Sequence, residues 1–188
     1  MNFNIRTLVL PLTLAAALAA APTASAADYV QTGGALTFAT AYQGETFAGS
    51  FPSFRTTMSF DPERPGEARL DVVIPLADVD TGLSDRDDTL RGSAFFNVGR
   101  FAEARYTAEG FTHLGGDRYS TDGVLELRGI SKPVTLEFTL SSGSRPELAG
   151  KARVSRLAFD VGGGSWADLS IIPDEVAVST RVRFVPAD

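Results

Sequence analysis

The 188-residue chain contains no cysteine, one histidine and one tryptophan, and its 23 acidic residues outnumber its 17 basic ones. Without cysteine it can form neither a disulfide framework nor a thiolate metal site, and one histidine leaves too few ligands for a zinc centre. The net charge of −6 disfavours nucleic-acid binding, which depends on lysine and arginine contacts to phosphates. Since 44% of the residues are hydrophobic, the chain is not of the disordered class either.

The residues that several kinds of catalysis need are also missing. A Ser/His/Asp triad requires a histidine as general base, and His113 stands at a predicted hairpin tip, where it is expected to be exposed. The glycines 162–164 lack the lysine and hydroxyl residue of a phosphate-binding loop. The acidic cluster 85–88 could hold a cation, but its arginine neighbour Arg86 and a predicted helix start favour a solvated helix face. We therefore predict that the protein is not an enzyme and has no cofactor.

The N-terminal residues have the pattern of a secretory signal peptide. Arg6 precedes an apolar run over residues 7–21, and Ala24-Ser25-Ala26 is a small-x-small cleavage site. The run is shorter than the roughly 20 residues that span a bilayer, and no stop-transfer segment follows. We predict a signal peptide over residues 1–26, and one exported domain over residues 27–188.

Alternation of apolar and polar residues dominates this domain, and a period of two is typical of strands with one buried face. Turn residues separate the alternating runs, for example the segment 61–66, which contains two prolines and a glycine. The pattern predicts eight strands, over residues 35–43, 45–61, 67–75, 103–112, 117–128, 133–142, 147–160 and 175–185. Short links favour antiparallel neighbours, since parallel pairing needs long crossovers. Such a meander can form a sandwich or close into a barrel, whose interior is either packed or open to one small ligand.

One connection, 75–102, is far longer than a hairpin link and is expected to have structure of its own. Ser84 followed by Asp87 resembles a capping box, and Gly92 is a plausible helix end. We predict short helices here that carry Phe95, Phe96 and Phe101 to one end of the barrel. These aromatic side chains either plug the core or form a moving lid.

The parity of the strands predicts which side chains point inward. Small inward residues, Gly49, Ala68, Gly123 and Ala152, would leave space beside the large ones. Each large side chain either fills the core or lines a cavity. The large inward candidates are Phe38, Tyr42, Phe47, Phe51, Phe60, Leu70, Val72, Ile74, Leu125, Leu127, Leu136, Phe138, Val178 and Phe184.

Four segments of the chain resemble the YceI-like periplasmic polyisoprenoid-binding proteins. The longest and most specific runs from Gly123 to Leu136 (GVLELRGISKPVTL). The others are Leu36-Thr37-Phe38 with Gly44, Phe47 to Phe51 and Phe54; Phe60-Asp61-Pro62; and Asp85-Arg86 with Phe95 to Val98 and Phe101. The resemblance covers nearly the whole predicted domain.

The resemblance implies an all-β fold, an eight-stranded antiparallel lipocalin-like barrel whose long interior tunnel holds an isoprenoid chain. It implies a periplasmic protein that carries or stores an isoprenoid lipid or quinone. The inward candidates above, together with Phe95, Phe96, Phe101, Phe159 and Trp166, are then the expected ligand-binding residues. Tyr42 and Arg128 depart from the family, because a histidine often stands at each of these positions.

The segment from Phe159 to Asp168 (FDVGGGSWAD) is similar to the subgroup associated with cytochrome b561-type membrane redox proteins. That similarity implies an alternative, in which the barrel is a packed scaffold and this segment contacts a membrane redox partner. Trp166 would then be an interface anchor, as exposed aromatic residues commonly are. A homodimer is also left open.

Overall fold

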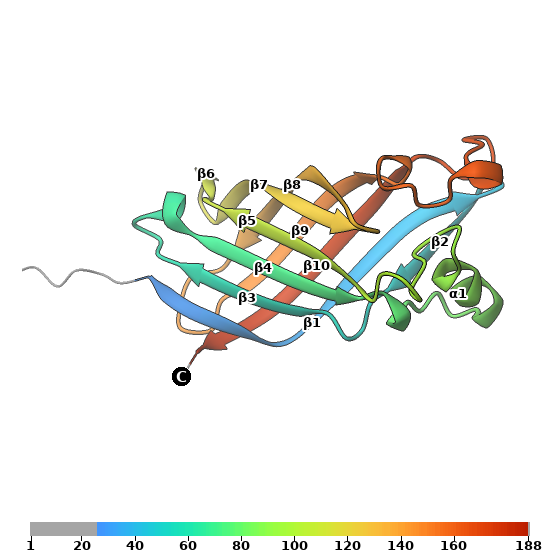
Figure 1. Cartoon of the computed structure of the whole chain (residues 1–188). Helices are drawn as coiled ribbons and strands as arrows, with labels where there is room; N and C mark the ends of the chain where they lie inside the picture. The colour runs from blue at the N-terminus through green and yellow to red at the C-terminus, as the bar shows by residue number, and fades with distance from the viewer. Residues whose placement is uncertain (1–25, 188) are drawn as a thin grey trace, which may run out of the picture.

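Antiparallel strand pairing accounts for most of the computed structural model, which describes residues 26–187 (Figure 1). All strand pairs are antiparallel, and β1 also pairs with β10, from Tyr29 opposite Pro186 to Ala39 opposite Ala177, so that the sheet closes. The strands are β1 (Ala27–Tyr42), β2 (Glu45–Ser50), β3 (Arg55–Phe60), β4 (Arg69–Pro75), β5 (Glu103–Glu109), β6 (Thr112–Gly115), β7 (Arg118–Leu127), β8 (Ile130–Leu140), β9 (Glu147–Ser155) and β10 (Glu175–Pro186).

These segments form an eight-stranded closed barrel, which confirms the predicted fold class. β2 and β3 both pair with β1 and are one barrel strand interrupted at residues 51–54, near Pro52. Likewise β5 and β6 both pair with β7 and are interrupted at Gly110, which has a left-handed φ of 77°. The sandwich alternative is wrong, because closure through β1 and β10 leaves no second sheet.

Several strand boundaries differ from the prediction, two of them by five residues or more. β1 begins at Ala27 rather than at residue 35, because the polar stretch that contains Gly33-Gly34 continues the strand instead of turning. A Cβ on Gly34 would lie 2.3 Å from the carbonyl oxygen of Arg181, so this glycine permits close approach of β10. The strand predicted over 147–160 ends at Ser155, and a short helix, η3 (Leu157–Phe159), follows. The predicted signal peptide lies outside the described residues, except for Ala26.

One end of the barrel, where the described C-terminus lies, is filled by aromatic rings. Phe111 packs edge-on against Phe138 at a centroid distance of 4.9 Å, and Phe60 lies 5.6 Å from Tyr119. Phe111, Tyr119 and Phe138 are buried, and Phe60 is partly buried. We call these four residues the closed-end cluster.

The predicted short helices lie at the opposite end, beside the β1–β2 hairpin and the β9–β10 connection (Figure 1). They are η2 (Leu76–Asp78) and α1 (Ser84–Arg91), and α1 ends at Gly92 as expected. Further single-turn helices are η1 (Pro65–Glu67) and η4 (Gly164–Trp166). In the described part of the chain, no helix is long and apolar enough to cross a bilayer.

The start of α1 differs from the predicted capping box. Leu83 occupies the N-cap position, without a side-chain cap hydrogen bond. Asp87 is buried rather than solvated, and its Oδ1 accepts hydrogen bonds from the Thr81 backbone N–H (2.8 Å) and hydroxyl (2.6 Å). Asp87 therefore fixes the turn that leads into α1, and the expectation of a solvated acidic face is wrong for this residue.

Candidate functional site

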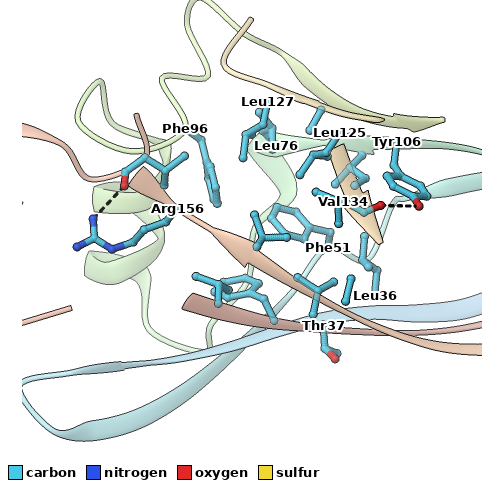
Figure 2. Close-up of a pocket in the computed structure, with 18 of the residues that line it drawn as sticks. Leu36, Thr37, Phe51, Leu76, Phe96, Tyr106, Leu125, Leu127, Val134 and Arg156 are labelled. Atoms are coloured by element: carbon cyan, nitrogen blue, oxygen red, sulfur yellow. Dashed lines mark hydrogen bonds between the residues drawn. The ribbon is translucent and has the colours of Figure 1, made fainter. Parts of the chain in front are cut away.

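The barrel encloses an apolar cavity of about 220 Å³ that reaches from its middle to the α1 end (Figure 2). Inward side chains of most strands contribute. Residues of the two long connections, 75–102 and the β9–β10 connection over 156–174, contribute as well. The lining residues are Leu36, Thr37, Phe38, Thr40, Phe47, Phe51, Val72, Ile74, Leu76, Leu90, Phe95, Phe96, Ala104, Tyr106, Leu125, Leu127, Val134, Leu136, Ala152, Val154, Arg156, Val161, Ile172, Val176, Val178 and Thr180.

Most of the predicted site residues lie in this lining. From the strands these are Phe38, Phe47, Val72, Ile74, Leu125, Leu127, Leu136 and Val178, and Phe51 joins them from the interruption between β2 and β3. Phe95 and Phe96 join them from the 75–102 connection, as expected of side chains carried to one end of the barrel. Whether these residues touch a ligand stays a prediction.

The other predicted residues lie outside the lining. Phe60 and Phe138 belong to the closed-end cluster, while Leu70, Phe159 and Phe184 are buried elsewhere in the core. Tyr42 ends β1, Phe101 precedes β5 and Trp166 ends η4, and none of the three lines the cavity. The cavity is thus shorter than a tunnel along the whole barrel axis, because aromatic rings occupy the closed end.

Sequence reasoning missed several lining residues, for two different reasons. Leu36, Tyr106 and Val134 lie on alternating strand positions, so parity could have identified them. Leu76, Leu90 and Ile172 come from the two long connections, where no periodic pattern marks an inward face.

Tyr106 forms part of the deeper wall of the cavity. Its hydroxyl donates a hydrogen bond to the carbonyl oxygen of Val134 over 3.1 Å (Figure 2). The ring covers Gly123 on β7, where an added Cβ would lie 2.4 Å from the ring. Burial of the phenol raises the pKa of Tyr106 to about 12. The side chain is therefore a neutral, oriented wall residue.

Arg156 is the only charged residue in the lining that the structure describes, and 4% of it is exposed. Burial lowers the pKa of its guanidinium, and nearby Asp174 opposes that change. All five N–H donors of the guanidinium are used by backbone carbonyl oxygens. Nε donates to Pro173 (3.0 Å), Nη1 to Val161 (3.0 Å) and Gly162 (2.6 Å), and Nη2 to Trp166 (2.9 Å) and Ile172 (2.8 Å). Arg156 therefore organises the β9–β10 connection at the end of the cavity.

Arg128 links the two long connections. Its Nη1 donates to the carbonyl oxygens of Ser93 (2.9 Å) and Phe95, and its Nη2 lies 3.0 Å from a carboxylate oxygen of Asp160. The backbone N–H of Gly162 adds a second link at this junction, because it donates to the carbonyl oxygen of Ala94 over 2.7 Å. Arg128 therefore joins these two connections and does not line the cavity.

Trp166 packs on the outer side of the cavity wall. Its ring lies 5.3 Å from that of Phe95, a lining residue, and 6.4 Å from that of Tyr42. Leu169, three residues after Trp166, is 55% exposed, and the Tyr42 side chain beside the Trp166 ring is 41% exposed. An aromatic and aliphatic surface therefore borders the α1 end of the barrel.

The site is therefore an apolar chamber inside a closed antiparallel barrel, an arrangement suited to hold a small hydrophobic molecule.

Comparison with known proteins identifies the family of the chain. Residues 23–184 match the YceI-like domain, and the chain belongs to the YceI-like family. A UPF0312 protein of Yersinia pestis is 34% identical over 138 residues, which cover 73% of this chain and 69% of that protein. A UPF0312 protein of Vibrio parahaemolyticus is 29% identical over 173 residues, covering 84% of this chain and 92% of that protein.

Solved structures have the same fold. BcnA of Burkholderia cenocepacia superposes with a TM-score of 0.76 at 25% identity, covering 80% of this chain and 95% of that one. A polyisoprenoid-binding domain from Saccharophagus degradans gives a TM-score of 0.66 at 16% identity, covering 86% of this chain and 99% of that one. The predicted family is thus confirmed, while membership of the cytochrome b561-associated subgroup stays a prediction.

Proposed function

We propose that the protein is a periplasmic binding protein that holds an isoprenoid lipid, a quinone or a polyprenyl chain, for transport or storage and without catalysis. The observation that carries this proposal is the cavity, whose wall is formed almost entirely by aliphatic and aromatic side chains. The predicted signal peptide supports the location. The likeness to a polyisoprenoid-binding domain supports the ligand class.

Burial of the isoprenoid tail can supply the affinity. Each buried methylene-sized group contributes about 0.8 kcal/mol, so one five-carbon unit contributes about 3 to 4 kcal/mol. Loss of free motion and chain ordering oppose binding by about 4 to 15 kcal/mol. Roughly three or more units are therefore enough for useful binding, and we expect affinity to rise with tail length.

The test is identification of the cargo. Protein purified gently from its native host should release an isoprenoid lipid into organic solvent, detected by mass spectrometry. Ala152→Phe, which fills the cavity from β9, should abolish the lipid signal. Ala149→Phe is the matched control, because Ala149 lies on the opposite face of the same strand and outside the cavity lining. Repeated lipid-free spectra from folded wild-type protein would contradict the proposal.

A second candidate function is contact with a membrane redox protein of the cytochrome b561 type. The observation that favours it is the position of Trp166 outside the cavity lining, in the same connection as exposed Leu169. Trp166→Ala should then reduce partner capture and leave lipid retention unchanged. If lipid is lost and capture is unchanged, Trp166 serves the cavity instead.

A further inference from the structure

The β1–β2 hairpin continues beyond the wall of the barrel. The last β1–β10 pair is Ala39 opposite Ala177, and among the described residues the following segment, 40–47, forms strand pairs only within itself. We call residues 40–47 the hairpin tip. Figure 1 shows that this end of the hairpin lies between α1 and η4. A two-stranded ribbon without further partner strands is only marginally stable, so the hairpin tip depends on its contacts with these neighbours.

The inner side of the hairpin tip forms part of the cavity wall. Thr40 and Phe47 stand opposite each other in the tip, and both line the cavity. The Phe47 ring packs edge-on against that of Phe38 at a centroid distance of 6.4 Å. Outward movement of the tip would remove Thr40 and Phe47 from the wall and open the cavity at the α1 end.

The contacts that hold the hairpin tip in place are weak ones. In the described part of the chain, a single backbone hydrogen bond joins it to the β9–β10 connection, from the N–H of Gln43 to the carbonyl oxygen of Ile171 over 2.8 Å. On the other side, the guanidinium of Arg86 on α1 lies 4.3 Å from the centre of the Phe47 ring. Five consecutive residues of the tip, 42–46, are exposed. Segments with few buried contacts and exposed backbone hydrogen bonds are those that open locally in native proteins.

Thr40 adds a cost to the closed position of the hairpin tip. Its Oγ1 is buried and has no hydrogen-bond partner among the residues that the structure describes. An unpaired buried hydroxyl destabilises the state that buries it. Outward movement of the tip brings water to this hydroxyl and relieves that cost.

The base of the same hairpin is held more firmly. Ser50 and Asp80 exchange two backbone hydrogen bonds, of 2.8 and 3.0 Å, which join β2 to the 75–102 connection. On the other strand, Ala39 pairs with Ala177 of β10. Ala39 also stands opposite Ala48 of β2, so two small side chains meet where the fixed base gives way to the tip. Bending is therefore expected at the Ala39–Ala48 pair.

The other routes into the cavity are closed by more interactions. Between the two long connections, Arg128 and the N–H of Gly162 donate to three carbonyl oxygens, and Arg128 also pairs with Asp160. The closed-end cluster fills the opposite end of the barrel with aromatic rings. Release of the hairpin tip therefore breaks the fewest interactions.

We propose that the hairpin tip is a flap that opens to admit ligands to the cavity, that it bends at the Ala39–Ala48 pair, and that the Arg86–Phe47 contact holds it shut. Entry and release then share one step, the opening of the flap, so a change in that step alters both rates alike and leaves the affinity unchanged. This role rests on the proposed function only in that the cavity takes up an apolar molecule, whatever its head group.

The absence of cysteine allows a tethering experiment. Gln43 and Ser170 are exposed, and Ser170 precedes Ile171, the hydrogen-bond partner of Gln43. In the double variant Gln43→Cys/Ser170→Cys, a short bis-maleimide joins the two thiols, and the same variant capped with N-ethylmaleimide is the matched control. Stopped-flow fluorescence with the neutral apolar dye N-phenyl-1-naphthylamine measures entry and release. We expect the tether to slow both rates by about tenfold or more relative to the capped variant, at unchanged affinity.

A second variant acts in the opposite direction. Arg86→Gln removes the cation from the Phe47 ring and should speed entry and release about threefold, again at unchanged affinity. Arg153→Gln, at an exposed arginine of β9, is the control and should leave both rates unchanged. Hydrogen exchange gives a readout that needs no ligand: amides of residues 40–47 should exchange faster than those of residues 36–39, and the tether should slow them.

Two failures are distinguishable. Equal dye rates in the tethered and capped proteins, or amides of the hairpin tip as protected as those of the base, would overturn the flap and leave the proposed function standing. A dye that does not bind folded wild type would contradict an apolar binding cavity, and hydrogen exchange would still decide whether the tip opens.

Discussion

Tyr106 connects the chemistry of the cavity wall with the pH dependence of stability. Its pKa is raised to about 12 from an ordinary value of 10.0, because burial disfavours the phenolate. Between these values the unfolded chain has released the proton that the folded chain still holds. The free energy of unfolding therefore falls as the pH rises from about 10 toward 12, and this contribution is fully present below pH 10.

Tyr106→Phe should remove this contribution. We expect the urea midpoint of the variant to fall less steeply than that of wild type between about pH 10 and 12. At neutral pH the variant should be less stable by about 1 kcal/mol, because the Val134 carbonyl loses its donor. Tyr42→Phe, at an exposed position, should keep the wild-type slope. Equal slopes for wild type and Tyr106→Phe would show that another group causes the alkaline loss.

Arg156 is the residue on which the end of the cavity most depends. Arg156→Leu would leave five carbonyl oxygens without their donor, and we expect it to destabilise the protein by about 3 kcal/mol or more. Hydrogen exchange should quicken at residues 157–174 before other regions. Arg153→Leu is the control: this exposed arginine, paired with Glu175 at 3.4 Å, should cost less than about 1 kcal/mol.

At the scale of elements, the seam between β1 and β10 decides whether the barrel closes. Gly34 lies on this seam, and a Cβ there would meet the Arg181 carbonyl oxygen at 2.3 Å and the Phe54 ring at 3.2 Å. Gly34→Ala should therefore destabilise the protein by about 1 to 3 kcal/mol or more, as measured by urea denaturation. Gly99→Ala, where no atom lies within 4 Å, should change stability by less than about 0.5 kcal/mol. Equal costs would mean that the seam tolerates a wider strand separation.

The same seam shows what a sequence can and cannot reveal about elements. Alternation at Leu36 and Phe38 identified the C-terminal half of β1 and its inward face. The N-terminal half was missed, because Gly33-Gly34 has the composition of a turn and only its pairing with β10 shows that it is extended. Local patterns record which face of a strand is buried, while the need for glycine at a close approach depends on a strand nearly 150 residues away in the sequence.

At the scale of the whole molecule, position along the barrel axis was the main quantity that could not be predicted. Leu136 and Phe138 have the same parity on β8, and both were expected to line the cavity. Leu136 does so, whereas Phe138 packs against Phe111 and Tyr119 in the closed-end cluster. A period of two distinguishes inside from outside, but the depth of the cavity depends on how rings from several strands fill one end. The lining residues of the two long connections could not be predicted either, because no periodic pattern marks their inward face.

Phe138 therefore sets the depth of the cavity, since it is the next inward residue beyond Leu136 toward the closed end. Phe138→Ala should deepen the cavity by roughly 7 Å, the distance between successive inward residues of a strand. It should cost about 3 to 5 kcal/mol in stability and shift binding preference toward longer tails. Competition between ubiquinones with two and four isoprene units measures that preference. Leu140→Ala, one inward position further on, is the matched control: it should also destabilise the protein while Phe138 still blocks the longer tail. An unchanged preference in Phe138→Ala would place the floor of the cavity at other residues.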